Sequence, residues 1–163
     1  MEGYYIIEVR LNNKLFFLLW KDERFFINDN NLLVCHAQRE IEAFITENKI
    51  QVSENVERYN LDGISELLLY INQSDKAREL LDYWNFFSDL SQTVGIDFFG
   101  DTDNDEVSEL YNKLVMGSNF EILHHEEYHP VLDENEQELI SFIFNNGIEL
   151  FKKCVSDYLR DQS

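Results

Sequence analysis

Near its start the chain reads Tyr4-Tyr5-Ile6-Ile7-Glu8-Val9-Arg10-Leu11, then Asn12-Asn13, then Lys14-Leu15-Phe16-Phe17-Leu18-Leu19-Trp20. Both flanking runs are rich in the aromatic, β-branched and leucine residues that favour strands. The two asparagines between them tolerate the left-handed backbone that a tight hairpin turn needs. This stretch therefore predicts a β-hairpin.

The same pattern continues after Trp20. Phe25-Phe26-Ile27 and Leu32-Leu33-Val34-Cys35 are short apolar runs, and the polar turn Asn28-Asp29-Asn30-Asn31 separates them. Together with the first hairpin they predict an antiparallel meander of three or four strands.

Helical spacing replaces strand spacing later in the chain. Helices are expected near 37–48, from Asp62 as N-cap through Ile71, over about 75–94, over about 104–116, and over about 133–159. Gly95 and Gly117 would close the third and fourth of these helices. The Asn145-Asn146-Gly147 triplet would kink the last helix or split it in two. Strands followed by helices indicate an α+β fold, an N-terminal antiparallel β-meander packed with about five C-terminal helices.

Size and composition support one domain over residues 1–163. The 163 residues are 44% hydrophobic and 14% aromatic, which excludes a disordered tail, and no repeat or linker is visible. The longest apolar run, Leu15–Trp20, is too short to cross a bilayer, and the N-terminus lacks the pattern of a secretory signal. Cys35 and Cys154 do not form a disulfide framework, and we expect them to be reduced and buried. A cytoplasmic protein is expected.

Charge is the most informative feature of the composition. The net charge is −19, which disfavours binding to nucleic acid or to anionic membranes and favours a basic protein partner. Residues 101–138 contain twelve acids and one base, Lys113. Several of these acids suit helix N-termini, so a solvated face of helix starts is one interpretation. The excess is larger than helix capping requires, so an acidic docking patch is slightly favoured.

His125-Glu126-Glu127-Tyr128-His129 matches the H-E-x-x-H pattern of zinc proteases, in which both histidines lie on one face of a helix. Pro130 follows the second histidine directly and disfavours a helix there. A surface loop with titratable histidines is therefore the main interpretation. A metal-dependent hydrolase that uses His125, Glu126 and His129 is the weakest alternative.

Other chemical motifs are incomplete. Asp101-x-Asp103-x-Asp105 begins like a calcium-binding loop, but Glu106 replaces the required glycine and Asn112 the required glutamate. No phosphate-binding glycine loop and no nucleophile elbow occurs in the sequence. The sequence supports no enzyme class, and we expect no cofactor and no metal.

The aromatic stretch Tyr83-Trp84-Asn85-Phe86-Phe87 is denser than one inner helix stripe requires. Core packing is the main interpretation. The alternative is that Tyr83 or Phe86 projects outward as an interface anchor.

Several of these segments together resemble a known family. They are the aromatic strand Leu15–Trp20, the helix residues Leu81, Trp84, Asn85, Phe87 and Asp89, the run Leu110-Tyr111-Asn112-Lys113-Leu114 with Gly117 and Asn119, and Tyr128-His129-Pro130. This pattern is similar to the acidic immunity proteins encoded beside bacterial polymorphic toxins, including contact-dependent growth inhibition systems. Ser118 and Val115-Met116 depart from the pattern.

The resemblance implies a protein that binds a cognate toxin nuclease and covers its active site. Such toxins are often basic RNases or DNases, and the resemblance does not tell which nuclease is bound. An endoribonuclease is the partner we expect first, with the EndoU type as one candidate. The residues expected to contact the toxin are Asp101, Asp103, Glu106, Glu126 and Glu127, with Tyr83 or Phe86 as aromatic anchors. An acidic adaptor or regulatory interaction domain without a toxin partner is the alternative.

Overall fold

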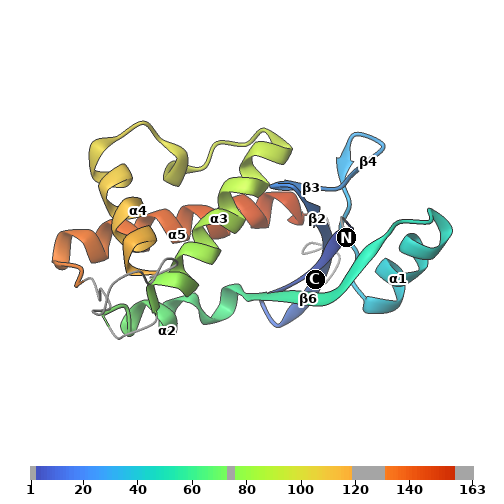
Figure 1. The fold of residues 1–163 in the computed structure, drawn as a ribbon, viewed down its shortest axis with the longest axis horizontal. Coiled ribbons are helices and arrows are strands. Elements are labelled where there is room, and N and C mark those ends of the chain that lie inside the picture. Colours follow the sequence, from blue (N-terminus) through green and yellow to red (C-terminus); the bar gives the residue numbers. More distant parts are fainter. Residues whose placement is uncertain (1–2, 73–75, 119–130, 157–163) are drawn as a thin grey trace. The chain divides into compact units, whose positions relative to one another are not determined.

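The computed structural model describes residues 3–72, 76–118 and 131–156, and its fold is α+β, as predicted (Figure 1). Contacts along the chain group it into two compact units. Unit 1 comprises Met1–Gly63, Asp89–Gly95 and Lys152–Ser163, and unit 2 comprises Ile64–Ser88 and Ile96–Phe151. The expectation of a single domain over residues 1–163 stays a prediction.

Unit 1 contains a four-stranded sheet of order β3-β2-β1-β6. The strands are β1 (Tyr4–Leu11), β2 (Lys14–Lys21), β3 (Arg24–Phe25) and β6 (Val52–Asn60). The predicted hairpin is present, because β1 and β2 pair in antiparallel register with Ile7 opposite Leu18. Asn12 and Asn13 have φ angles of 53° and 60°, the left-handed conformation that this turn requires.

Asp62 has a different role from the helix cap that we expected. It lies in the short 3₁₀ helix η1 (Leu61–Gly63), and its carboxylate accepts hydrogen bonds from the backbone of the hairpin turn. The backbone N–H of Asn12 donates to Oδ1 at 2.7 Å and that of Asn13 donates to Oδ2 at 2.9 Å. Asp62 therefore holds a turn that is 50 residues away in sequence.

Strand β6 was not predicted, and it pairs in parallel with β1. It is mostly exposed and carries polar residues on both faces, so it lacks the apolar runs by which the other strands were recognised. A parallel pair needs a crossover connection. Helix α1 (Gln38–Glu47) lies within the segment that joins β5 to β6, at the position expected for the first helix.

The second predicted hairpin is smaller than expected. It consists of β4 (Ile27–Asn28) and β5 (Asn31–Leu32), which pair with each other in a separate two-stranded sheet. The prediction that residues 32–35 form one strand is wrong. Cys35 instead makes an isolated antiparallel bridge to Phe17.

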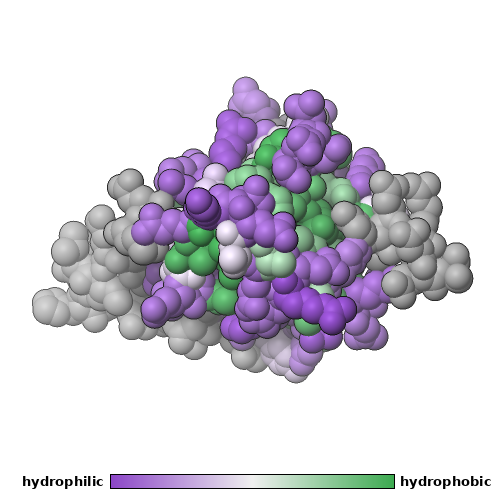
Figure 2. All heavy atoms as spheres, turned by 90° about the vertical axis from the view of Figure 1, so that its right-hand side faces the viewer, coloured by the Kyte–Doolittle hydropathy of each residue, from purple (hydrophilic) through white to green (hydrophobic). Residues whose placement is uncertain are grey.

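The core of unit 1 explains why β2 is continuously apolar. Phe16, Phe17, Leu18 and Leu19 are all buried, so both faces of this central strand are covered. Phe17 and Leu19 belong to a cluster that includes Ile41 of α1. Partly buried apolar side chains, among them those of Tyr4, Phe26 and Phe44, pack around this cluster, and hydrophobic side chains remain visible among hydrophilic ones on the face that Figure 2 shows.

The end of α3 (Lys76–Val94) is hydrogen-bonded to the sheet of unit 1. Trp20 Nε1 donates to Asp89 Oδ2 at 2.9 Å. The Arg24 guanidinium donates to the Gln92 carbonyl oxygen at 2.9 Å, and the Phe25 N–H donates to Thr93 Oγ1 at 3.0 Å. Gly95, with φ of 74°, ends this helix as predicted.

We expect Trp20→Phe to lower the free energy of unfolding by about 1–2 kcal/mol, because it removes a half-buried hydrogen bond to a carboxylate and keeps most of the apolar ring. Chemical denaturation measures this change. Tyr5→Phe is the matched control, since the Tyr5 ring lies beside Trp20 at 5.9 Å between centroids. An equal loss in both variants would show that the Trp20–Asp89 hydrogen bond contributes nothing.

Unit 2 is helical. It contains α2 (Ile64–Leu69), most of α3, the 3₁₀ turn η2 (Phe99–Asp101), α4 (Asp105–Gly117) and most of α5 (Glu134–Cys154). Gly117 is buried and is the last residue of α4, so the helix ends within one residue of the expected position, with Ser118 as its C-cap. Helix α5 is continuous through residues 145–147, so the triplet does not split it, and the alternative that the triplet kinks the helix stays a prediction.

Aromatic rings from α3 and α5 fill the core of unit 2. Phe144 lies within 6.5 Å, between centroids, of Tyr83, Trp84 and Phe87, and Phe86 lies 6.1 Å from Phe151. The dense aromatic stretch of α3 is thus mainly core, as its main interpretation held. Among the helices of the described residues, none has the length and apolarity needed to cross a membrane.

Candidate functional site

The turn η2 is the centre of the candidate site, and three contacts hold it. Ser88 Oγ of α3 donates to Asp101 Oδ1 at 2.6 Å. The backbone N–H of Phe99 donates to Asn146 Oδ1 of α5 at 2.7 Å, and the Phe99 ring packs edge-on against Phe142 at 4.9 Å between centroids. These contacts fix the Asp101 carboxylate relative to α3 and α5.

Gly100 allows this turn to approach α3 closely. A Cβ at this position would lie 2.5 Å from the Phe98 ring and 2.8 Å from Trp84 Nε1. Both aromatic side chains are buried and cannot easily move away. Any side chain at residue 100 would therefore push the turn outward.

A polar pocket of about 420 Å³ lies between α3, η2 and α4. Trp84, Ser88, Asp101, Tyr111 and Asn112 are among the residues that line it. Tyr111 packs edge-on against Trp84 at 5.2 Å between centroids, and its hydroxyl donates to Asn85 Oδ1 at 2.7 Å. The pocket thus combines one carboxylate with aromatic and amide groups.

Helix α4 begins beside this pocket with a well-formed cap. Asn104 Oδ1 accepts hydrogen bonds from the N–H groups of Glu106 and Val107 at 2.9 and 3.2 Å. Asp105 and Glu106 occupy the first turn, where the helix dipole favours acids.

We name as the acidic surface the eight exposed acids that the structure describes within residues 101–138. They are Asp101, Asp103, Asp105, Glu106, Glu109, Asp133, Glu134 and Glu138. Four of them stand at the start of a helix, where the helix dipole favours acids: Asp105 and Glu106 at α4, and Asp133 and Glu134 at α5. Helix starts do not account for the other four.

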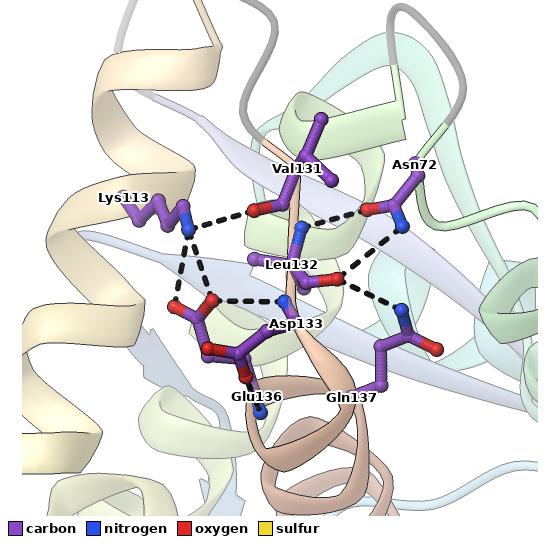
Figure 3. A network of polar contacts seen from close by, with 7 residues as sticks. All are labelled: Asn72, Lys113, Val131, Leu132, Asp133, Glu136 and Gln137. Carbon is purple, nitrogen blue, oxygen red and sulfur yellow. Dashed lines mark hydrogen bonds and ion pairs between the residues drawn. The ribbon is translucent and has the colours of Figure 1, made fainter.

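The ninth described acid, Glu136, has a structural role in the network of Figure 3. The Asp133 N–H donates to Glu136 Oε1 at 3.0 Å, and the Glu136 N–H donates to Asp133 Oδ1 at 2.8 Å. This reciprocal pair is a capping box at the start of α5. Lys113 of α4 adds an ion pair to Glu136 at 2.9 Å and a hydrogen bond to the Val131 carbonyl oxygen at 2.8 Å. The one base of residues 101–138 is therefore engaged within the protein.

The same network ties the turn that follows α2 to the start of α5. The side-chain amide of Asn72 exchanges two hydrogen bonds with the backbone of Leu132, at 2.8 and 3.3 Å (Figure 3). Gln137 Nε2 also donates to the Leu132 carbonyl oxygen, at 2.8 Å. The network thus holds the acids that open α5 in one arrangement relative to Asn72 and to α4.

We expect Lys113→Met to lower the free energy of unfolding by about 1–2 kcal/mol, because the half-buried Glu136 loses its ion pair and Val131 loses a hydrogen bond. Lys76→Met is the control, since its ion pair with Glu79 spans one helix turn at the surface and should contribute about 0.5 kcal/mol or less. Urea denaturation of both variants tests this. A loss of the same size in Lys76→Met would contradict a special role for Lys113.

The sequence-predicted contact residues divide into three groups. Asp101, Asp103 and Glu106 are exposed and lie in one short segment from η2 into α4. Glu126 and Glu127 lie outside the described residues, as do His125 and His129 of the histidine motif. The prediction that Tyr83 or Phe86 projects outward is wrong, because these side chains are only 8% and 3% exposed and pack against Phe144 and Phe151.

Phe142 of α5 is an exposed aromatic side chain that the sequence analysis did not single out as a candidate contact residue. It is 56% exposed and lines a shallow depression with Glu134 and Glu138. Its neighbour Ile143 is buried, so a shift of one residue in the helical pattern decides which of the two faces solvent. In the sequence, the acids Glu134 and Glu138 on the same helix could have indicated that Phe142 lies on an exposed face.

The described residues contain no group of three or more His, Cys, Asp or Glu side chains that could hold a metal ion. Both cysteines are free thiols. Cys35 is buried, as expected. Cys154 is only partly buried, so the expectation that it is buried is wrong. Burial raises the pKa of Cys154 to about 11, so this thiol is a poor nucleophile near neutral pH.

The chain was compared with protein-family models, with curated proteins and with solved structures, and nothing in the three comparisons matches it.

Proposed function

We propose that this protein binds a basic bacterial toxin nuclease and neutralises it by covering the active site with its acidic surface. The observation that carries this proposal is the exposure of eight acids in unit 2 while Lys113, the one base among them in sequence, is paired internally. The family resemblance of the sequence supports the same function.

Electrostatics explains how such a surface would act. A nuclease binds a polyanion, so its active-site cleft carries positive charge. Clustered carboxylates accelerate encounter with such a cleft and align the two proteins before contact. Carboxylate oxygens also take the place of the phosphate oxygens that the cleft would otherwise bind. The nuclease would then lose access to its substrate for as long as the complex persists.

Phe142 supplies what the acids lack, an apolar anchor. Charges at the edge of an interface mainly set the association rate, whereas buried aromatic residues slow dissociation. The exposed ring of Phe142 lies beside Glu134 and Glu138 on α5 and is supported by Phe99 of η2. This pairing suits the centre of an interface with acids around it.

We expect Phe142→Ala to weaken toxin binding about tenfold or more, mainly by faster dissociation, with little loss of stability because the ring is more than half exposed. Surface plasmon resonance separates the two rate constants. Leu69→Ala is the control, since Leu69 is 78% exposed on α2 and does not line the depression that Phe142 shares with Glu134 and Glu138. Equal affinities of Phe142→Ala and the unchanged protein would remove Phe142 from the interface.

The direct test of the function is co-expression with the C-terminal domain of the protein encoded immediately upstream. RNA cleavage is measured for that domain alone and in the complex, with an RNase as the first activity to assay. A complex that survives purification and silences cleavage would support the proposal. An active nuclease that this protein neither binds nor inhibits would refute it.

A further inference from the structure

The pocket between α3, η2 and α4 carries an inference about how a partner is recognised. Of the described residues that line it, none is basic and one, Asp101, is acidic. The Asp101 carboxylate accepts the Ser88 hydroxyl on one oxygen and is thereby held at the pocket wall. A pocket with one fixed carboxylate and no cation favours a cationic guest.

The remaining lining narrows the chemistry of that guest. Tyr111 offers an aromatic ring, while Ser108, Asn112 and Thr102 add hydroxyl and amide oxygens that can accept hydrogen bonds. A guanidinium group is planar, stacks on aromatic rings and presents five donors in a fixed fork. An ammonium group is compact and strongly hydrated, so it would use this lining less fully.

The size of the pocket agrees with a side chain rather than a whole folded segment. A volume of about 420 Å³ accommodates one long side chain together with part of the backbone that carries it. The exposed acids Asp103 and Glu106 follow in the same segment and would attract a basic guest toward the opening.

We propose that this pocket binds an arginine side chain, which the toxin nuclease inserts beside Asp101. The assignment of this arginine to the toxin nuclease rests on the proposed function. The preference of the pocket for a guanidinium group does not. The guanidinium would donate to the Asp101 carboxylate and lie against the Tyr111 ring.

The first test uses this protein alone and a small probe. N-acetyl-arginine N-methylamide is titrated into ¹⁵N-labelled protein, with the lysine and norleucine analogues as comparisons. We expect saturable shifts confined to the Trp84 indole, the Asn85 and Asn112 side-chain amides and the Gly100 backbone, weaker shifts with lysine and none with norleucine. No saturable shift at these groups, or equal binding of the lysine analogue, would overturn the proposal.

The second test compares two variants, each of which removes one negative charge. Asp101→Asn keeps an acceptor for Ser88 and should weaken probe binding about tenfold by removing the charge-assisted hydrogen bonds. Asp103→Asn is the control, because Asp103 is exposed nearby but does not line the pocket. Equal losses in the two variants would indicate general attraction by the acids and would contradict a specific site.

Ser108→Arg provides a variant that occupies the pocket from within. Ser108 is exposed on α4 and lines the pocket, so a long side chain there can enter it without disturbing the core. We expect this variant to fold normally and to lose probe binding. Normal folding with unchanged probe binding would contradict the assignment of the pocket.

The toxin complex separates this inference from the proposed function. Probe binding by a protein that does not bind the nuclease would refute the function and support the arginine site. A tight nuclease complex that Asp101→Asn and Ser108→Arg leave unchanged, together with no probe binding, would refute the site and support the function.

Discussion

Replacing Gly147 by alanine is expected to lower the free energy of unfolding by about 2–3 kcal/mol. A Cβ at this position would lie 2.4 Å from Cγ and Cδ2 of Phe87. That ring is fully buried and is surrounded by Phe86, Phe98 and Phe144, so it has no space into which it can shift. Alanine is the better helix former by about 1 kcal/mol, but the steric clash outweighs this gain.

Thermal and chemical denaturation measure the effect of Gly147→Ala. Asn145→Ala is the matched control, because Asn145 lies on the same helix two residues earlier and is exposed. Its change should be neutral or slightly stabilising, since alanine has the higher helix propensity. A Gly147→Ala protein as stable as the control would show that α3 and α5 do not pack as closely as described.

Reversing three charges of the acidic surface is expected to weaken inhibition of the toxin nuclease about 100-fold. The variant carries Asp101→Lys, Asp103→Lys and Glu106→Lys, which changes the net charge by +6 within one segment. Most of the loss should appear in the association rate, and it should shrink at high salt because screening weakens the attraction in the unchanged protein. Inhibition of RNA cleavage and stopped-flow binding at two salt concentrations measure it.

The control for this variant carries Glu47→Lys, Glu54→Lys and Glu57→Lys, which change the net charge equally at exposed positions of unit 1. Lysine in the first turn of α4 costs about 0.3–1 kcal/mol through the helix dipole, so the stability of both variants is measured in parallel. If both variants lose affinity equally, net charge alone governs binding and the acidic surface has no specific role.

Local sequence was a reliable guide where neighbouring residues decide the structure. The β1–β2 hairpin followed from two apolar runs and the Asn12-Asn13 turn, and α4 lies where the sequence predicted a helix over about 104–116. Prediction from local sequence failed where the structure of a residue depends on a partner that is distant in the chain. Asp62 looked like a helix cap because its true partners, Asn12 and Asn13, are 50 and 49 residues away.

Strand β6 illustrates the same limit. Its own residues are polar and mostly exposed, so they carry little strand signal. It forms because β1 offers a hydrogen-bonding edge and α1 occupies the crossover that a parallel partner requires. The backbone hydrogen bonds that stabilise this strand are made with β1, so the residues of β6 alone do not predict it.

The acidic character of this protein and its α+β class follow from the sequence, because charge is additive and hydrophobic spacing is local. The tertiary structure decided which residues reach the surface. It buried Tyr83 and Phe86, exposed Phe142, engaged Lys113 with Glu136 and placed Asp101 at the wall of a pocket. Side-chain exposure depends on which helix faces another, and this is settled by packing between segments that are far apart in the chain.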